Sequence, residues 1–167
     1  MLLDTLRCIN CGEQCPLIPN TIWICSNCQQ QYPLLDQNQW NALTGDFNEA
    51  VKELYDDRSD KHNDTSAAVG YLSERQQNIV IYAFAAAMKN RFRGSILDVG
   101  CGHGRFAHSL IDRLGEPESI TGIDLSAAQL SHVKNHRMHC FQADASSTPF
   151  VDGQFDVVYS AEVIQNV

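Results

Sequence analysis

A run of alternating glycines in the middle of the chain constrains the fold more than any other feature. Residues 95–106 read Ser-Ile-Leu-Asp-Val-Gly-Cys-Gly-His-Gly-Arg-Phe. The apolar residues around Asp98 predict a short buried strand. Gly100, Gly102 and Gly104 predict a tight turn, because glycine tolerates positive φ and lets a ligand lie against the backbone. A helical pattern follows directly, and the free N–H groups at its start would face the same ligand. The stretch therefore predicts a nucleotide-type site.

The spacing of the glycines restricts the type of nucleotide. A dinucleotide fingerprint has two residues between its second and third glycine, but here only His103 separates Gly102 from Gly104. The Gly-Lys-Ser/Thr run of a phosphate-binding loop is also missing from the sequence. The carboxylate of Asp98 would repel a pyrophosphate and attract an ammonium group. S-adenosylmethionine, which has an amine, a carboxylate and a ribose but no phosphate, fits these residues better.

Four consecutive segments resemble class I S-adenosylmethionine-dependent methyltransferases. Residues 96–104 are similar to the first motif of that family, residues 122–126 (Gly-Ile-Asp-Leu-Ser) to the second, and residues 142–145 (Gln-Ala-Asp-Ala) to the next. Residues 149–160, which end in Phe-Asp-Val-Val-Tyr-Ser, resemble the fourth strand. The resemblance covers residues 71–167 and implies an α/β fold, doubly wound around a mostly parallel sheet.

The resemblance also implies which residues bind the methyl donor. Asp98 would attract its ammonium group, Asp124 would accept hydrogen bonds from the ribose hydroxyls, and Asp144 would accept from the adenine amino group. A plain helix cap is the alternative role for Asp124. The full set of predicted cofactor-binding residues is Asp98, Gly100, Cys101, Gly102, Gly104, Asp124, Leu125, Asp144, Ala145 and Ser160.

The general base stays unidentified in the sequence. Glu162 follows the fourth strand, where members of the family often place residues that contact the acceptor. The first turn of a helix is the alternative role for Glu162.

The segments between these motifs predict alternating helices and strands. Ser73 begins a capping box, and the helix that it opens should end near Arg91. A second helix should end at Gly115, with strands at 119–123 and 138–143 on either side of a helix at 127–133. The expected buried face of the first helix consists of Ile79, Val80, Ala83, Phe84, Ala87 and Met88.

The sequence encodes only part of the sheet that the resemblance implies. A complete sheet has seven strands in the order 3-2-1-4-5-7-6, and the residues up to Val167 supply the incomplete order 3-2-1-4. The fourth strand, residues 155–160, is almost continuously apolar, which is typical of a strand buried on both faces. At a sheet edge it would expose unpaired backbone groups.

The preferred interpretation of the incomplete sheet is that the chain is a fragment of a longer protein. Completion of the sheet by another chain and edge pairing between two copies are the alternatives. We therefore expect an isolated chain to be a homo-oligomer or poorly soluble.

Two Cys-x-x-Cys pairs near the N-terminus predict a metal site. Cys8 and Cys11 are separated by thirteen residues from Cys25 and Cys28. Each pair places two thiolates on one tight turn, and two such turns form a closed four-sulfur site for Zn²⁺. Cys15 is a spare cysteine that could replace one ligand. Disulfides and a redox Cys-x-x-Cys are the less favoured alternatives.

The cysteine pairs belong to a small module, residues 1–36, which we expect to be a zinc ribbon. Its order of cysteine pair, aromatic strand, cysteine pair and Tyr32-Pro33 resembles the zinc modules of some rRNA guanine-N1 methyltransferases and of the activator subunit of eukaryotic methyltransferases. A segment this small has little apolar core of its own, so metal would supply much of its folding free energy. Residues 37–70 are polar and predict a solvated linker with a short helix near 48–55, or alternatively a lid over the methyl donor. Residues 71–167 would form the N-terminal part of a methyltransferase domain.

The charge of the chain bears on its partners. The net charge is −8, and Arg7 is the only basic residue before residue 37, whereas nucleic-acid binding normally needs clustered Lys and Arg. We expect a methyltransferase whose acceptor is a small molecule or a protein. An rRNA or tRNA base methyltransferase with an RNA-binding ribbon and a non-catalytic partner subunit are the alternatives. The sequence shows neither a signal peptide nor a membrane span, which predicts a cytoplasmic protein with reduced cysteines.

Overall fold

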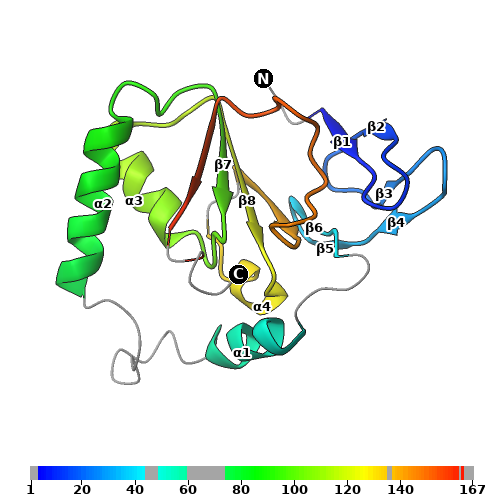
Figure 1. The fold of residues 1–167 in the computed structure, drawn as a ribbon, viewed down its shortest axis with the longest axis horizontal. Coiled ribbons are helices and arrows are strands. Elements are labelled where there is room, and N and C mark those ends of the chain that lie inside the picture. Colours follow the sequence, from blue (N-terminus) through cyan, green and yellow to red (C-terminus); the bar gives the residue numbers. More distant parts are fainter. Residues whose placement is uncertain (1–3, 44–48, 60–73, 135–136, 162, 164–167) are drawn as a thin grey trace.

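The chain forms a mostly parallel sheet with helices and a small cysteine-rich module packed around it (Figure 1). The computed structural model describes residues 4–43, 49–59, 74–134, 137–161 and 163. The strands in this part of the chain are β1 (Thr5–Arg7), β2 (Gln14–Pro16), β3 (Trp23–Ile24), β4 (Gln31–Tyr32), β5 (Leu34–Asp36), β6 (Gln39–Asn41), β7 (Ser95–Val99), β8 (Ser119–Asp124), β9 (Met138–Gln142) and β10 (Val157–Ser160). The helices are α1 (Glu49–Ser59), α2 (Glu74–Met88), α3 (Arg105–Leu114) and α4 (Ala127–Leu130).

The main sheet has the strand order β10-β7-β8-β9-β6-β5. The strands from β10 to β6 run parallel to their neighbours, and only β5 pairs antiparallel, with β6. The segment β9-β8-β7-β10 is the 3-2-1-4 order expected from the sequence, and that expectation is confirmed. Because parallel strands end at the same edge, the turn after β7 and the tips of β8 and β9 lie along one side of the sheet.

The sheet is wider than expected, because β5 and β6 extend it beyond β9. The sequence places Gln39–Asn41 in a solvated linker, and this expectation is wrong. Trp40 is fully buried and stacks on Phe141 of β9, with ring centroids 5.1 Å apart. Its indole Nε1 donates to the carbonyl oxygen of Thr21 in the cysteine-rich module at 2.8 Å. A three-residue strand with one apolar side chain has no recognisable alternation, so only the tertiary contact identifies it.

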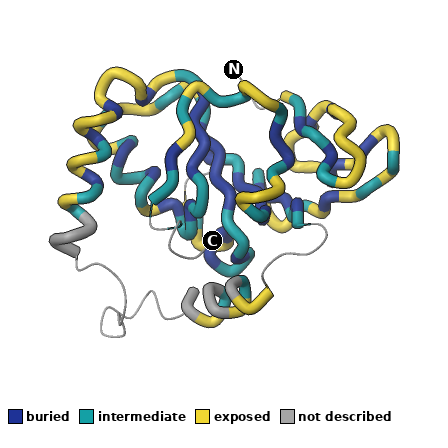
Figure 2. The backbone as a smooth tube through the Cα atoms, viewed as in Figure 1, coloured by how far each residue is buried: buried dark blue, intermediate teal, exposed yellow. Residues whose placement is uncertain are grey.

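Two apolar clusters lie on opposite faces of the sheet, as the alternation of side chains along a strand requires. Figure 2 shows the central strands as the most deeply buried part of the chain. Ile96, Ile120 and Cys140 pack with residues of α2 and α3. Leu97, Ile123 and Phe141 pack on the other face with the cysteine-rich module.

The cysteine-rich module shares this second cluster and does not stand alone. Leu6, Trp23 and Tyr32 of the module belong to the same buried cluster as Phe150 from the loop before β10. Two hydrogen bonds fix the module to that loop: the backbone N of Arg7 donates to the carbonyl oxygen of Pro149 at 2.8 Å, and Gln154 Nε2 donates to that of Thr5 at 2.7 Å. The module therefore draws part of its stability from the sheet.

Helix α2 has the expected start but a different buried face. It ends at Met88, three residues before the expected Arg91. Ile81, Ala85 and Met88 are buried, whereas Ile79 is 60% exposed and Ala83 and Ala87 are also exposed. The predicted buried face is thus wrong for Ile79, Ala83 and Ala87. Because apolar residues, many of them alanines, occur on both sides of this helix, its periodicity alone does not fix the side that faces the sheet.

Strand β10 is buried on one face only. Tyr159 is 6% exposed and packs toward the helices, but Val158 on the opposite face is 59% exposed. The expectation of burial on both faces is therefore wrong for the part of the chain that the structure describes, because the module covers the sheet near β8 and β9 and leaves Val158 open.

The segment before α2 is described only in part. Helix α1 confirms the short helix expected near residues 48–55, although it extends to Ser59. Of the predicted linker or lid, residues 37–70, residues 44–48 and 60–70 lie outside the described residues. Among the helices that are described, none has the length and apolar character needed to cross a membrane.

Trp40 offers a test of the junction between module and sheet. Trp40→Ala should lower the free energy of unfolding by about 3–5 kcal/mol, the usual cost of truncating a buried aromatic side chain. Leu35→Ala in the neighbouring strand, where Leu35 is 41% exposed, should cost less than about 1 kcal/mol. Urea denaturation measures both values, and equal losses would contradict a special role for Trp40.

Candidate functional site

The glycine turn after β7 adopts the backbone conformation that the sequence predicts. Gly100, Gly102 and Gly104 have φ values of 74°, 52° and 77°. A residue with a side chain would adopt this backbone conformation only with strain. A Cβ on Gly100 would also collide with the side chain of Val163. The backbone N–H groups of Gly100 and Cys101 donate to the carbonyl oxygen of Ile123 at 2.8 and 2.9 Å, so the turn is anchored to β8.

Gly122 on β8 is a further residue on which the turn depends. A Cβ there would collide with Met138 and with the thiol of Cys101. The glycine therefore lets the buried Cys101 side chain pack directly against β8. The sequence gives Gly122 only as part of the second motif, and its role in packing follows from the structure.

Asp124 joins the tip of β8 to the glycine turn. Its Oδ2 accepts from the backbone N–H of Gly102 at 2.8 Å, and its Oδ1 accepts from that of Ser126 at 2.9 Å. Burial raises the pKa of Asp124, and these backbone hydrogen bonds offset only part of the rise. The N-cap of α4 is Ser126, whose Oγ accepts from the N–H of Gln129 at 3.1 Å. Asp124 is thus not the cap of α4.

Asp98 is buried beneath the turn. Asp98 is 1% exposed, and its Oδ2 accepts a hydrogen bond from the hydroxyl of Tyr159 at 2.9 Å. Burial raises the pKa of Asp98 to about 7 and the charge of Asp124 adds to the rise, while the Tyr159 hydrogen bond opposes it. The two acids lie on the neighbouring strands β7 and β8, close enough for the charge of one to act on the other.

Asp144 follows β9 and is held within its own turn. Its Oδ1 accepts from the backbone N and the Oγ of Ser146, at 2.7 and 2.6 Å. Ala145 beside it is exposed. Leu125, the predicted neighbour of Asp124, is half-buried, and its carbonyl oxygen accepts from Gln142 Nε2 at 2.9 Å. The structure places Asp144 at the adjacent strand end, with its contacts directed to its own turn.

Two polar side-chain atoms at the same edge are buried and have no hydrogen-bond partner among the described residues. These are the Oγ of Ser160, which the sequence predicts as a cofactor contact, and the Nε2 of Gln129 on α4. The Gln129 side chain lies against the turn, with its Oε1 3.7 Å from the position of a Cβ on Gly102. An unpaired buried donor costs about 1–3 kcal/mol, so a ligand that accepts from Gln129 would be stabilised. Gln129 is not recognisable from the sequence, because its only signal is a polar residue on a short helix.

Helix α1 reaches this region through Asp56. The carboxylate of Asp56 accepts a short hydrogen bond from Ser126 Oγ, and Lys52 Nζ donates to it at 2.8 Å. Burial raises the pKa of Asp56, but the bonds from Lys52 and Ser126 outweigh it, so the net pKa is lowered. An ionised Asp56 therefore holds α1 at Ser126, the N-cap of α4, which is two residues from Asp124. No sequence pattern indicates this contact.

The four cysteines of the two pairs converge in the N-terminal module. The Sγ atoms of Cys8, Cys11, Cys25 and Cys28 all lie within 4.8 Å of one another. The separations are 3.6 Å between Cys8 and Cys28 and 3.5 Å between Cys11 and Cys25. Four thiolates about 2.3 Å from a tetrahedral Zn²⁺ are about 3.8 Å apart, so the arrangement fits this ion. Cys15 is outside the group, and its Sγ accepts from the N–H of Ser26 at 3.3 Å.

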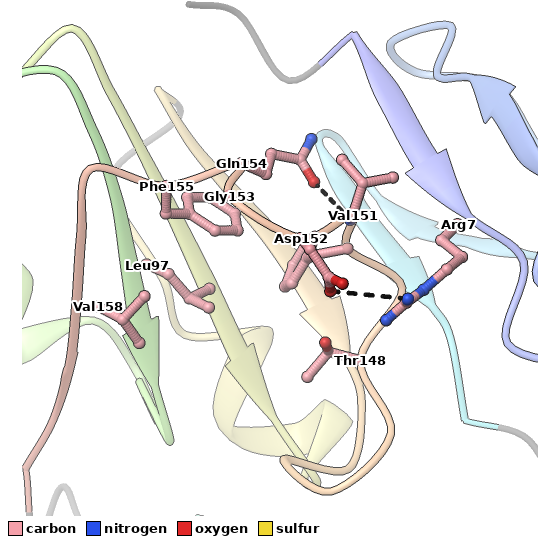
Figure 3. A pocket seen from close by; sticks show the side chains of 10 residues that line it. Arg7, Leu97, Thr148, Val151, Asp152, Gly153, Gln154, Phe155 and Val158 are labelled. Carbon is pink, nitrogen blue, oxygen red and sulfur yellow. Dashed lines mark hydrogen bonds and ion pairs between the residues drawn. The ribbon is translucent and has the colours of Figure 1, made fainter.

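A cavity of about 210 Å³ lies between the module and the open face of the sheet (Figure 3). Leu97, Phe155 and Val158 form part of its apolar wall, and the ion pair between Arg7 and Asp152, at 3.7 Å, lies at its rim. None of its lining residues belongs to the glycine turn. This cavity is therefore separate from the predicted cofactor site.

A second cavity lies between the module and the loop that follows Asp144. Its volume is about 350 Å³, and its wall contains Cys8 and Ile9 of the first cysteine turn together with Ala145–Thr148. The first cysteine turn thus lies beside the loop that follows Asp144.

Comparison with known proteins agrees with the fold and the motifs. Residues 96–167 match the family model described as "Methyltransferase domain". The fatty-acid O-methyltransferase of Mycolicibacterium smegmatis is 33% identical over 89 residues, which are 51% of this chain and 32% of that protein. The phthiotriol/phenolphthiotriol dimycocerosates methyltransferase of Mycobacterium leprae is 36% identical over 89 residues, 51% of this chain and 33% of that protein. The chain spans about a third of the length of these curated relatives.

A solved structure shares the fold over most of the chain. It is described as a putative S-adenosyl-L-methionine-dependent methyltransferase from Methanococcus maripaludis, and it matches with a TM-score of 0.50 at 18% identity, over 75% of this chain and 56% of that one. The chain is therefore similar in sequence to methyltransferase domains over residues 96–167, and it shares its fold with a solved structure described as a putative methyltransferase.

The burial of Asp98 predicts a pH-dependent stability. An unfolded Asp ionises near pH 4, but the folded pKa of Asp98 is about 7. The folded chain thus keeps a proton that the unfolded chain has lost, and this stabilisation is present below pH 4 and is lost as the pH rises to 7. Asp98→Asn cannot ionise, so its stability relative to wild type should increase by up to about 1.4 kcal/mol per pH unit in this range and level off above pH 7.

Denaturant titrations of the ligand-free chain between pH 5 and 8 measure this difference. Asp112→Asn, at an exposed position on α3, is the matched control and should show a much smaller pH dependence. A difference between Asp98→Asn and wild type that is constant with pH would contradict the prediction.

Proposed function

We propose that the chain binds S-adenosylmethionine at the glycine turn and that the protein transfers its methyl group to a small molecule or a protein. The observation that carries this proposal is the bond between the Asp124 carboxylate and Gly102 N–H, within electrostatic range of Asp98. It gathers two acids and an open backbone turn at the edge where parallel strands end, the usual ligand site of such sheets.

The residues at this edge match the parts of the proposed cofactor. Asp98 would attract the ammonium group, and Asp124 would accept from the ribose hydroxyls with the lone pairs that its backbone bonds leave free. Asp144 Oδ2, which accepts no hydrogen bond from a described residue, is available for the adenine amino group. The unpartnered Ser160 and Gln129 supply further polar contacts.

The bound cofactor would supply an activated methyl group on a sulfonium. In-line displacement from a sulfonium needs little covalent help, so the main task of this chain would be to bind and orient the donor. Holding two reactants in line can contribute about 7–11 kcal/mol to lowering a barrier. Glu162, the expected acceptor-side residue, lies outside the described residues.

The acceptor is more consistent with a small molecule or a protein than with RNA. The names of the two relatives refer to a fatty acid and to phthiotriol and phenolphthiotriol dimycocerosates. Arg7, the only basic residue of the module, already pairs with Asp152. Phosphate recognition usually requires several free cations on one face, and the module lacks them.

We further propose that the module binds one Zn²⁺ through Cys8, Cys11, Cys25 and Cys28. Four thiolates leave no open coordination position, which is typical of a structural rather than a catalytic zinc. The ion would hold the first cysteine turn in place beside residues 145–148.

Ligand binding tests the cofactor proposal. Isothermal titration calorimetry should detect binding of S-adenosylhomocysteine to the full chain, and Asp124→Asn should weaken it about 10- to 100-fold, since hydrogen bonds to a charged group contribute about 1.5–3 kcal/mol. Asp112→Asn, exposed on α3, should leave the affinity unchanged.

A wild-type chain that binds neither this compound nor S-adenosylmethionine would contradict the proposal and favour a non-catalytic partner subunit. RNA binding that weakens steeply with salt would favour the base methyltransferase.

Metal analysis tests the zinc proposal. The purified chain should hold one equivalent of Zn²⁺, and Co²⁺ substitution should give the absorption of a tetrahedral thiolate site. Cys25→Ser should abolish stoichiometric binding and lower the melting temperature. Cys140→Ser, at a buried cysteine of β9 outside the cluster, should retain the metal. A metal-free wild-type chain with unchanged stability in chelator would contradict the prediction.

A further inference from the structure

Tyr159 places a single hydroxyl group inside an otherwise apolar layer. It lies on β10 directly opposite Asp98 in the parallel register with β7, the neighbouring strand in Figure 1. Its ring packs between Phe84 of α2 and Phe106 of α3, with both centroids 6.1 Å away. Packing alone would be satisfied by phenylalanine, so the hydroxyl, which requires a partner when buried, calls for a separate explanation.

That partner is the carboxylate of Asp98. The Tyr159 hydroxyl donates to Oδ2 at 2.9 Å, and among the described residues no other side chain donates to Asp98 and no Lys, Arg or His pairs with it. The bond fixes one carboxylate oxygen, while Oδ1 has no hydrogen-bond partner in the described part of the chain. Asp98 is therefore a half-satisfied acid at the base of the glycine turn.

A half-satisfied buried carboxylate favours a cationic partner. The charge of Asp124 lies nearby and has the same sign, so the described surroundings provide repulsion and one neutral donor. A ligand ammonium would supply the missing positive charge in an environment of low dielectric, where such interactions are strong. Within the proposed cofactor, this group occurs only in the amino-acid half.

We propose that Tyr159 is a positioning residue, whose hydroxyl holds the Asp98 carboxylate so that its free oxygen serves the ammonium group of the cofactor's amino-acid half. Tyr159 then determines how tightly that half is held and has little influence on the nucleoside half. This inference rests on the proposed function. It adds to that function a residue on the fourth strand whose hydroxyl, among the described residues, bonds to another protein side chain, the carboxylate of Asp98.

Two ligands that differ in the amino-acid half separate this role from simple packing. S-adenosylhomocysteine carries the ammonium group, and 5′-methylthioadenosine keeps the nucleoside and thioether but lacks it. Calorimetry of the full chain would compare wild type with Tyr159→Phe, which keeps the ring between Phe84 and Phe106. Tyr82→Phe on α2, where Tyr82 is 62% exposed, is the matched control.

We expect Tyr159→Phe to weaken S-adenosylhomocysteine about tenfold, the effect of losing one hydrogen bond to a charged group, and to change 5′-methylthioadenosine by less than about twofold. Tyr82→Phe should change neither affinity. In an Asp98→Asn background, Tyr159→Phe should have little further effect, because the two side chains act through one bond.

The outcomes that would overturn the proposal are distinct from those that would overturn the proposed function. Unchanged S-adenosylhomocysteine affinity in Tyr159→Phe would refute the positioning role, and equal weakening of both ligands would assign Tyr159 to packing alone. Retained binding of 5′-methylthioadenosine shows that the variant is folded. A wild-type chain that binds neither ligand would instead refute the cofactor site itself.

Discussion

The hydrogen bond from Gly102 N–H to the Asp124 carboxylate connects the turn after β7 with the tip of β8. The other features at this edge depend on it. It holds a backbone that only glycine adopts without strain, and it keeps Asp124 beside Ser126, the start of α4. Because a hydrogen bond to an ionised group contributes about 1.5–3 kcal/mol, this bond is strong enough to help fix a turn in which Cys101 is the main side chain that packs against β8.

The buried Asp98 on β7 lowers the stability of the empty protein but would favour binding of a cationic ligand. Ionised Asp98 is unfavourable in the empty protein, since burial and the charge of Asp124 both raise its pKa. A cationic ligand would offset this repulsion. The amide of Asp98→Asn would remove the repulsion even without ligand, but it would also remove the attraction for a cation. The pH-dependent stability expected from Asp98 and its proposed attraction for a cationic ligand therefore have one physical origin. Local destabilisation of this kind is common at functional sites.

The N-terminal module and the sheet stabilise each other. Trp40 forms the junction, because its ring stacks on Phe141 while its Nε1 bonds to the module. The module is too small to bury an apolar core of its own. The apolar cluster that it shares with the sheet and the proposed metal would therefore both contribute to its stability. One consequence is that the first cysteine turn lies beside residues 145–148, which brings the module close to the predicted adenine end of the cofactor site.

The order of the central strands was predicted from the family that the motifs resemble. The sequence by itself determined the glycine turn and the four cysteines of the cluster, because these depend on local spacing: positive φ at alternate residues, and pairs of thiols on tight turns. The tertiary structure decided what depends on contacts between distant residues. Gln39–Asn41 is a strand only because Trp40 stacks on β9, the alanines of α2 allow either face to be buried, and Val158 is open because the module covers a different part of the sheet. The partners of the acids, Tyr159 for Asp98 and Gly102 for Asp124, are 61 and 22 residues away in sequence, a separation that no local pattern encodes.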